Sequence, residues 1–156
     1  MPAPAFKKAR KSQLPPRQSE DQLQMTLAAY LDKALAGLPA VWFAVPNGGA
    51  RLKKSVTSAD GRTRSWSPEA QKLKAMGVKP GVADLVVIHC GEVIFLEVKT
   101  DKGSLSDVQK EFCAAALAAC AGFYVVRSID DVYAALRAHS VPVRARPSAH
   151  PARLYD

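Results

Sequence analysis

The segment Val93–Lys99 is a short apolar run that ends in two charged residues, Glu97 and Lys99, with Val98 between them. A strand made almost entirely of Val, Ile, Leu and Phe is typical of the centre of a sheet, where both faces are covered. Successive side chains point to opposite faces of a strand, so the carboxylate and the amine share one face. Burying two charges costs free energy unless they pair or bind a cation. The segment therefore predicts a central strand with a charged site at its end, and a structural ion pair is the alternative.

Helical and strand periodicities on both sides of this strand predict an α/β domain. Two segments have the form of a capping box, Ser19-Glu20-Asp21-Gln22 and Ser106-Asp107-Val108-Gln109, and each is expected to start a helix. The helix that starts after Ser106 is expected to bury Val108 and Ala119. Residues 50–66 are expected to form a long exposed loop or a loose hairpin. The expected order is αβ(α)ββαβα, a mixed central sheet flanked by helices, with helices over 19–38, 68–76, 107–121 and 129–138 and strands over 41–45, 84–89, 92–99 and 123–127.

The composition fits one folded domain. The chain has 156 residues, 48% of them hydrophobic, and a mean hydropathy of -0.07. No apolar run reaches the ~18–20 residues of a membrane span, and the basic N-terminus lacks the apolar stretch of a secretory signal. The three cysteines include no C-x-x-C pair, which disfavours a zinc ribbon or a disulfide scaffold. We therefore expect no membrane association and a location in a reducing cytoplasm.

The net charge of +8 is unevenly distributed. Residues 1–17 contain five basic residues and no acidic one, and residues 51–79 contain eight basic residues against two acidic ones. Prolines interrupt both ends of the chain, so we expect a disordered basic arm over 1–17, a folded domain over 18–138 and an irregular basic tail over 139–156. The rest of the chain is acidic. Basic segments on an acidic body are typical of a protein that binds a polyanion, although basic tails can also serve solubility alone.

A second short strand, expected over 84–89, begins with Asp84. Only a tight turn separates it from the central strand, so the start of one strand adjoins the end of the other. Asp84 and Glu97 are therefore expected to lie within reach of one cation. Carboxylate oxygens around an open position suit Mg²⁺ or Mn²⁺, and such a cation would offset the cost of the buried charge.

Asp84 followed by Glu97-Val98-Lys99 resembles the PD-(D/E)xK nuclease motif. Flanking segments narrow the resemblance to the VRR-NUC family, the virus-type replication-repair nucleases, in its stand-alone phage and bacterial form. Across roughly residues 19–138, four blocks occur in that family's order: Pro46-Asn47-Gly48-Gly49, Met76 to Leu85, Leu96 to Lys99, and Leu105 to Gln109. One departure is Ala83, which stands where the family usually has a proline. This change affects the rigidity of the loop and not the metal ligands. The resemblance implies a restriction-endonuclease-like core and a metal-dependent nuclease.

The resemblance also implies roles for individual residues. Lys99 would orient the attacking water and stabilise charge in the transition state. Gln109 would touch Lys99 or the scissile phosphate. The implied ligands of the Mg²⁺ or Mn²⁺ ion are Asp84, Glu97, the main-chain carbonyl of Val98 and, directly or through water, Glu20.

Glu20 and Gln109 each have a simpler interpretation as well. Glu20 lies three residues before Leu23, so the helical period directs its side chain inward and not to solvent. An acidic residue in the first turn also suits the helix dipole without any further role. Gln109 faces the sheet by the same reasoning, but it could act only within its capping box.

Candidate nucleic-acid contacts lie mostly in the basic segments. Their charge suits phosphate contacts better than base recognition, and the Asn-Gly-Gly sequence could be an ordinary turn instead of an approach to the DNA backbone. The candidates are Asn47, Gly48, Gly49, Arg51, Lys53, Lys54, Arg62, Arg64, Lys7 and Lys8.

The sequence thus predicts an endonuclease that hydrolyses the DNA backbone. The family resemblance implies a homodimer that cuts Holliday junctions or other branched DNA in repair, in a bacterial or phage-infected cytoplasm. One site per chain cuts one strand, so a symmetric substrate calls for two sites. The main alternative is a non-catalytic nucleic-acid-binding module on the same fold, and a more distant one is an α/β phosphohydrolase for small phosphate esters.

Overall fold

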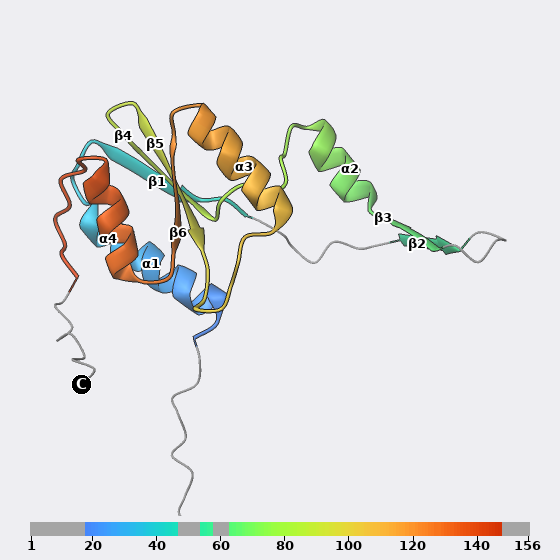
Figure 1. Ribbon diagram of the computed structural model, residues 1–156, viewed down its shortest axis with the longest axis horizontal. Helices are drawn as coiled ribbons and strands as arrows, with labels where there is room; N and C mark the ends of the chain where they lie inside the picture. Colours follow the sequence, from blue (N-terminus) through green and yellow to red (C-terminus); the bar gives the residue numbers. More distant parts are fainter. Residues whose placement is uncertain (1–17, 47–53, 58–62, 148–156) are drawn as a thin grey trace, which may run out of the picture.

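The computed structural model describes residues 18–46, 54–57 and 63–147, with only the backbone course given for 54–57 and 63–66 (Figure 1). The basic arm expected over 1–17 and the end of the tail, 148–156, lie outside the described residues. The helices are α1 (Glu20–Ala34), α2 (Pro68–Ala75), α3 (Asp107–Ala118) and α4 (Ile129–Ala138). The strands are β1 (Ala40–Ala44), β2 (Lys54–Thr57), β3 (Thr63–Trp66), β4 (Leu85–His89), β5 (Glu92–Val98) and β6 (Gly122–Val126).

Four strands form a mixed sheet in the order β1-β4-β5-β6. β4 pairs antiparallel with both β1 and β5, whereas β6 pairs parallel with β5. The expected central position of the apolar strand is confirmed, because β5 lies between β4 and β6. The α/β class and the order of helices and sheet strands are confirmed too. The segment between β1 and α2 adds a two-stranded hairpin, β2-β3, which decides between the two alternatives expected there.

Helices cover both faces of the sheet (Figure 1). On one face α1 and α4 bury a continuous apolar core against alternate residues of the strands, among them Leu85, Ile94 and Leu96. On the other face the ring of Phe112 in α3 packs between Phe95, at 5.0 Å, and Phe123, at 6.3 Å. This layering buries β5 on both sides, which is why its charged end requires compensation.

Both predicted capping boxes are present. Ser19 caps α1 with Gln22 at the third position, and Ser106 caps α3 with Gln109 in the same role. These caps explain why the two helices begin where the sequence indicates, since each satisfies backbone N–H groups that a helix start leaves free.

The later part of α3 departs from its expected pattern. The helix ends at Ala118 and not at the expected residue 121, and β6 begins at Gly122, one residue before the expected strand. Val108 is 44% exposed, and Ala119 is exposed as well. The prediction that these two side chains are buried is wrong, because α3 contacts the sheet through Phe112 and Ala116 and turns Val108 away from it.

α2 and the hairpin project from the body beside the end of the sheet where β4 begins (Figure 1). α2 has no buried residue. The chain returns from it through Gly81, whose φ of +76° favours glycine and whose position leaves no room for a side chain. An added Cβ would lie 2.3 Å from the carbonyl oxygen of Val108, so the loop that leads to Asp84 is pressed against the start of α3.

The chain beyond α4 remains irregular up to residue 147 but is packed. Val141 is fully buried, the Arg144 N–H donates to the Ala34 carbonyl at 2.9 Å, and the Tyr30 hydroxyl donates to the Ala145 carbonyl at 2.9 Å. No helix in the described part of the chain has the length and apolarity needed to span a membrane.

Candidate active site

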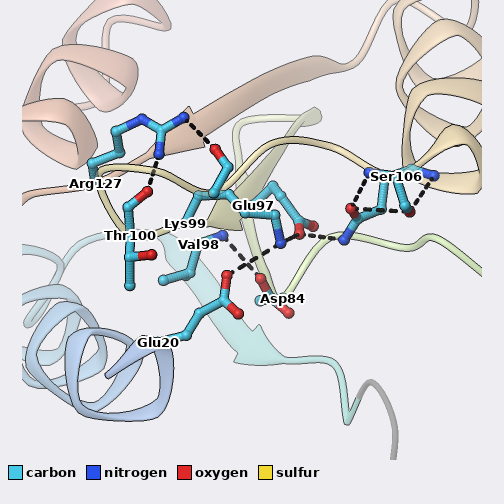
Figure 2. A network of polar contacts seen from close by, with 10 residues as sticks. Glu20, Asp84, Glu97, Val98, Lys99, Thr100, Ser106 and Arg127 are labelled. Carbon is cyan, nitrogen blue, oxygen red and sulfur yellow. Dashed lines mark hydrogen bonds and ion pairs between the residues drawn. The ribbon is translucent and has the colours of Figure 1, made fainter. Parts of the chain in front are cut away.

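The start of β4 and the end of β5 meet at one edge of the sheet. Leu85 pairs with Leu96, so the next residues outward, Asp84 and Glu97, follow in adjacent strands. The Asp84 Oδ2 atom accepts a hydrogen bond of 2.9 Å from the main-chain N–H of Val98 (Figure 2). The N–H and C=O of one strand residue point to the same side, so the Val98 carbonyl also lies on the Asp84 side. Asp84, Glu97 and Val98, three of the four predicted ligands, thus lie together at this edge.

Glu97 is the only charged residue in the described part of the chain with no solvent exposure at all. Its Oε1 atom lies 2.6 Å from the Lys99 ammonium, which confirms that the two side chains share a face. Its Oε2 atom is buried and has no hydrogen-bond partner among the described residues. A buried carboxylate oxygen without a partner carries a large desolvation cost, which a cation at this position would offset.

Glu20 reaches the same site from the first turn of α1. Its Oε1 atom lies 3.2 Å from the Lys99 ammonium, so Lys99 bridges Glu20 and Glu97 (Figure 2). The expectation that Glu20 points away from solvent holds only in part, because half of its side chain is exposed. It lies at the open side of the site, where the sheet ends.

Gln109 combines both interpretations. Its side-chain oxygen accepts from the Ser106 N–H at 2.9 Å and from the Ser106 hydroxyl at 3.1 Å, completing the capping box. Its amide nitrogen donates to Glu97 Oε1. The residue therefore reaches the site, but its partner there is Glu97 and not Lys99, one of its two predicted contacts; the other, the scissile phosphate, remains a prediction.

The titration of the buried pair reflects this crowding. Burial raises the pKa of the Glu97 carboxyl above its ordinary value; the hydrogen bond from Lys99 opposes the shift, and the negative charges of Asp84 and Glu20 add to it. Burial lowers the pKa of the Lys99 ammonium, but the hydrogen bond and charge of Glu97, assisted by Glu20, outweigh that effect and raise it overall. Two carboxylates thus contact the Lys99 ammonium, and a third, that of Asp84, acts on Glu97, which leaves excess negative charge that suits a cation.

A divalent metal ion fits these donors if water and substrate phosphates supply the remaining ligands. The described residues contain no group of three or more His, Cys, Asp and Glu side chains arranged as a complete metal site. Mg²⁺, however, keeps several water ligands and commonly binds only one or two carboxylates together with substrate phosphates. Asp84, the unpartnered Glu97 oxygen and the Val98 carbonyl make such an incomplete, oxygen-only set.

Sequence reasoning missed Arg127, the first residue after β6. Its guanidinium donates to the main-chain oxygens of Thr100 and Gly103, the latter at 2.8 Å (Figure 2). A signal was available, because β5 and β6 are parallel strands joined by a helix, and the residues that follow such strands meet at one edge. Arg127 therefore borders the loop that follows Lys99.

Most candidate nucleic-acid contacts fall outside the described residues: Lys7, Lys8, Asn47, Gly48, Gly49, Arg51, Lys53 and Arg62. Lys54 and Arg64 are placed only by their backbone, in β2 and β3, where Lys54 pairs with Trp66 and Arg64 pairs with Val56, two register positions further along the hairpin. The hairpin departs from the same edge as the carboxylates, since it is inserted between β1 and the loop leading to Asp84.

No family model matches the chain, and comparison with curated proteins and with solved structures gave no match either.

Proposed function

We propose that this protein is a Mg²⁺- or Mn²⁺-dependent DNA endonuclease with a restriction-endonuclease-like core of the VRR-NUC type. The observation that carries the proposal is the fully buried Glu97, whose Oε2 atom has no partner in the described structure while Asp84, Lys99 and Glu20 surround it. A protein gains no stability from such an arrangement, since a buried carboxylate is costly. A bound cation, together with the substrate phosphate, would offset the desolvation cost of the Glu97 carboxylate.

Asp84, Glu97 and the Val98 carbonyl would hold the metal ion, which when bound supplies Lewis-acid activation of water and of the phosphate. Lys99 is held by Glu97 and Glu20 beside that position, where its ammonium can orient the attacking water and offset charge on the phosphate oxygens. Gln109 donates to Glu97 and so fixes the orientation of that carboxylate.

The proposed substrate is branched DNA, such as a Holliday junction, cut by a homodimer in the cytoplasm of a bacterial or phage-infected cell. The charge distribution supports DNA as the partner, since the segments 1–17 and 51–79 are strongly basic while the site itself is acidic; branched DNA, the homodimer and the cell type rest on the family resemblance. Basic segments that neutralise phosphates would draw DNA toward a site whose own carboxylates repel it until a cation binds. A homodimer is tested by sedimentation at several protein concentrations, with a concentration-independent monomer as the contrary result.

Cleavage of labelled four-way junctions, flaps and linear duplexes under single-turnover conditions tests the proposed reaction. We expect cleavage with Mg²⁺ or Mn²⁺ and none with excess chelator, and a loss of about 1,000-fold in Glu97→Ala, as for removal of a central transition-state interaction. Glu111→Gln, at an exposed position of α3, is the matched carboxylate control and should cleave like the wild type. An inert wild type across the panel, or a Glu97→Ala variant that cleaves at the same rate, would rule the enzyme out.

A non-catalytic nucleic-acid-binding module is the second candidate. It is favoured by the fact that Lys99 already neutralises one Glu97 oxygen and that the described side chains form no complete metal site. In that case wild type and Glu97→Ala bind DNA equally and neither cleaves. Binding should also weaken steeply with salt, which separates both DNA-binding candidates from a hydrolase of small phosphate esters.

A further inference from the structure

The loop after β5 is fastened by Arg127, which is itself fixed at the start of α4. The Arg127 N–H donates to Asp131 Oδ2 at 2.8 Å, and the Asp131 N–H donates in turn to the hydroxyl of Ser128, the N-cap of the helix. From this base the guanidinium donates to the carbonyls of Thr100 and Gly103 (Figure 2). The Gly103 N–H also donates to the Thr100 carbonyl, at 2.9 Å, so a tight turn is held at both of its ends.

This turn lies directly on the side chain of Lys99. A Cβ added to Gly103 would lie 3.0 Å from Cδ and 3.2 Å from Cβ of Lys99. The turn therefore borders the aliphatic stem, while Glu97 and Glu20 hold the ammonium at 2.6 and 3.2 Å. Lysine has a flexible four-carbon stem whose ordering costs conformational entropy, so a group that confines the stem favours one position of the charge.

From these contacts we infer that Arg127 is a positioning residue, which confines Lys99 through the turn Thr100–Gly103. Its two terminal nitrogens are directed at main-chain carbonyls, so the guanidinium acts through the backbone and not by contact with a substrate. The small size of Gly103 is part of the arrangement, because it lets the turn approach the stem closely. The consequence for DNA cleavage rests on the proposed function, whereas the confinement of Lys99 does not.

The reactivity of individual lysines toward an amine-acylating reagent, measured on the full chain by peptide mass spectrometry, tests this inference. Lys99 is only 12% exposed and should react slowly, whereas Lys110, 63% exposed, serves as an internal reference. Arg127→Gln removes the charged donors to the turn, and we expect Lys99 to react roughly tenfold faster in it, as for loss of one charged hydrogen bond. Arg127→Lys, which keeps the positive charge but on a single donor nitrogen, should give a smaller increase, and Arg137→Gln, at an exposed arginine of α4, should give none.

Gly103→Ala provides an independent variant should Arg127→Gln fail to fold. It keeps the carbonyl that Arg127 contacts but presses a methyl group on the Lys99 stem, so Lys99 should again react faster. An unchanged Lys99 rate in Gly103→Ala and in a folded Arg127 variant, or an equal rise at Lys110, would overturn the inference. If the wild type cleaves DNA, the same variants should lower the single-turnover rate without weakening DNA binding. If it does not cleave, the proposed function fails while the acylation rates still decide the role of Arg127.

Discussion

The starts of α1 and α3 are built alike, yet they meet the site differently. Each has serine at the N-cap and glutamine three residues later, and each forms a complete capping box. In α1 the Gln22 side-chain oxygen accepts from the Ser19 N–H at 3.0 Å, and the residue that reaches the site is its neighbour Glu20. In α3 the glutamine itself reaches the site, because the Gln109 amide donates to Glu97.

The difference comes from the position of each helix relative to β5. α3 follows β5 in the chain and packs on the face that carries Glu97 and Lys99, so its third residue lies beside the buried carboxylate. α1 packs on the opposite face and reaches round the end of the sheet with its first residue, which therefore stays half exposed. A cap motif thus fixes where a helix begins, and the sheet decides which cap residue acquires a second contact.

Replacing each capping-box glutamine with glutamate should produce the largest difference in cleavage rate between the two capping boxes. Glutamate at the third position preserves a capping box and suits the positive end of the helix dipole. In Gln109→Glu, however, it replaces the amide donor with a carboxylate against Glu97, and we expect the single-turnover rate of DNA cleavage to fall about 100-fold, as for loss of an outer ligand contact. Gln22→Glu should stay within about twofold of the wild type.

Thermal denaturation of both variants provides the control, because a folding defect would lower the melting temperature of Gln109→Glu far below that of Gln22→Glu even with metal present. Equal cleavage rates in the two variants would show that the contact between Gln109 and Glu97 has no effect on the reaction.

The pH dependence of the free energy of unfolding tests whether burial of the Glu97 carboxylate destabilises the fold. Its folded pKa is raised, chiefly by burial, so the folded state holds the proton more tightly than the unfolded state. Its contribution to stability is therefore greatest at low pH and is lost as the pH rises from the ordinary value of 4.5 through the raised one. The unfolding free energy of the wild type should fall relative to that of Glu97→Gln across this interval. Chemical denaturation at a series of pH values without metal measures the difference, and parallel curves would contradict it.

The sequence predicts this fold well where local signals and the apolar run agree. The N-caps Ser19 and Ser106 mark two helix starts, and the apolar residues of β5 indicate a central strand. The pairing of Asp84 with the end of β5 follows from the tight turn between the strands, since adjacent antiparallel strands bring start and end together.

The rest depends on contacts that no local pattern encodes. Val108 has the helical phase of a buried residue, but α3 packs on the sheet through Phe112 and Ala116, and this side chain faces solvent. The N-cap Ser128 places Arg127 at the end of a strand but does not give its partners, because the contacts with Thr100 and Gly103 arise only when the two parallel strands end side by side. The pairing of Gln109 with Glu97 in place of Lys99 likewise depends on how the side chains pack, since Glu97 and Lys99 are themselves in contact.

Removing the N-cap serines should produce the smallest difference in cleavage rate between changes at the two helix starts. Ser19→Ala and Ser106→Ala each delete one hydroxyl that accepts from the backbone, at 3.2 and 3.4 Å, and each should lower the unfolding free energy by about 1 kcal/mol. Ser106→Ala also removes the hydroxyl that donates to Gln109, so it should slow cleavage several-fold, roughly the value of one hydrogen bond. Ser19→Ala loosens only the half-exposed Glu20 and should slow it less. Denaturation and single-turnover rates on the same samples provide both quantities. A larger rate loss in Ser19→Ala would reverse the assignment, because it would mean that the contact of Glu20 with Lys99 matters more than that of Gln109 with Glu97.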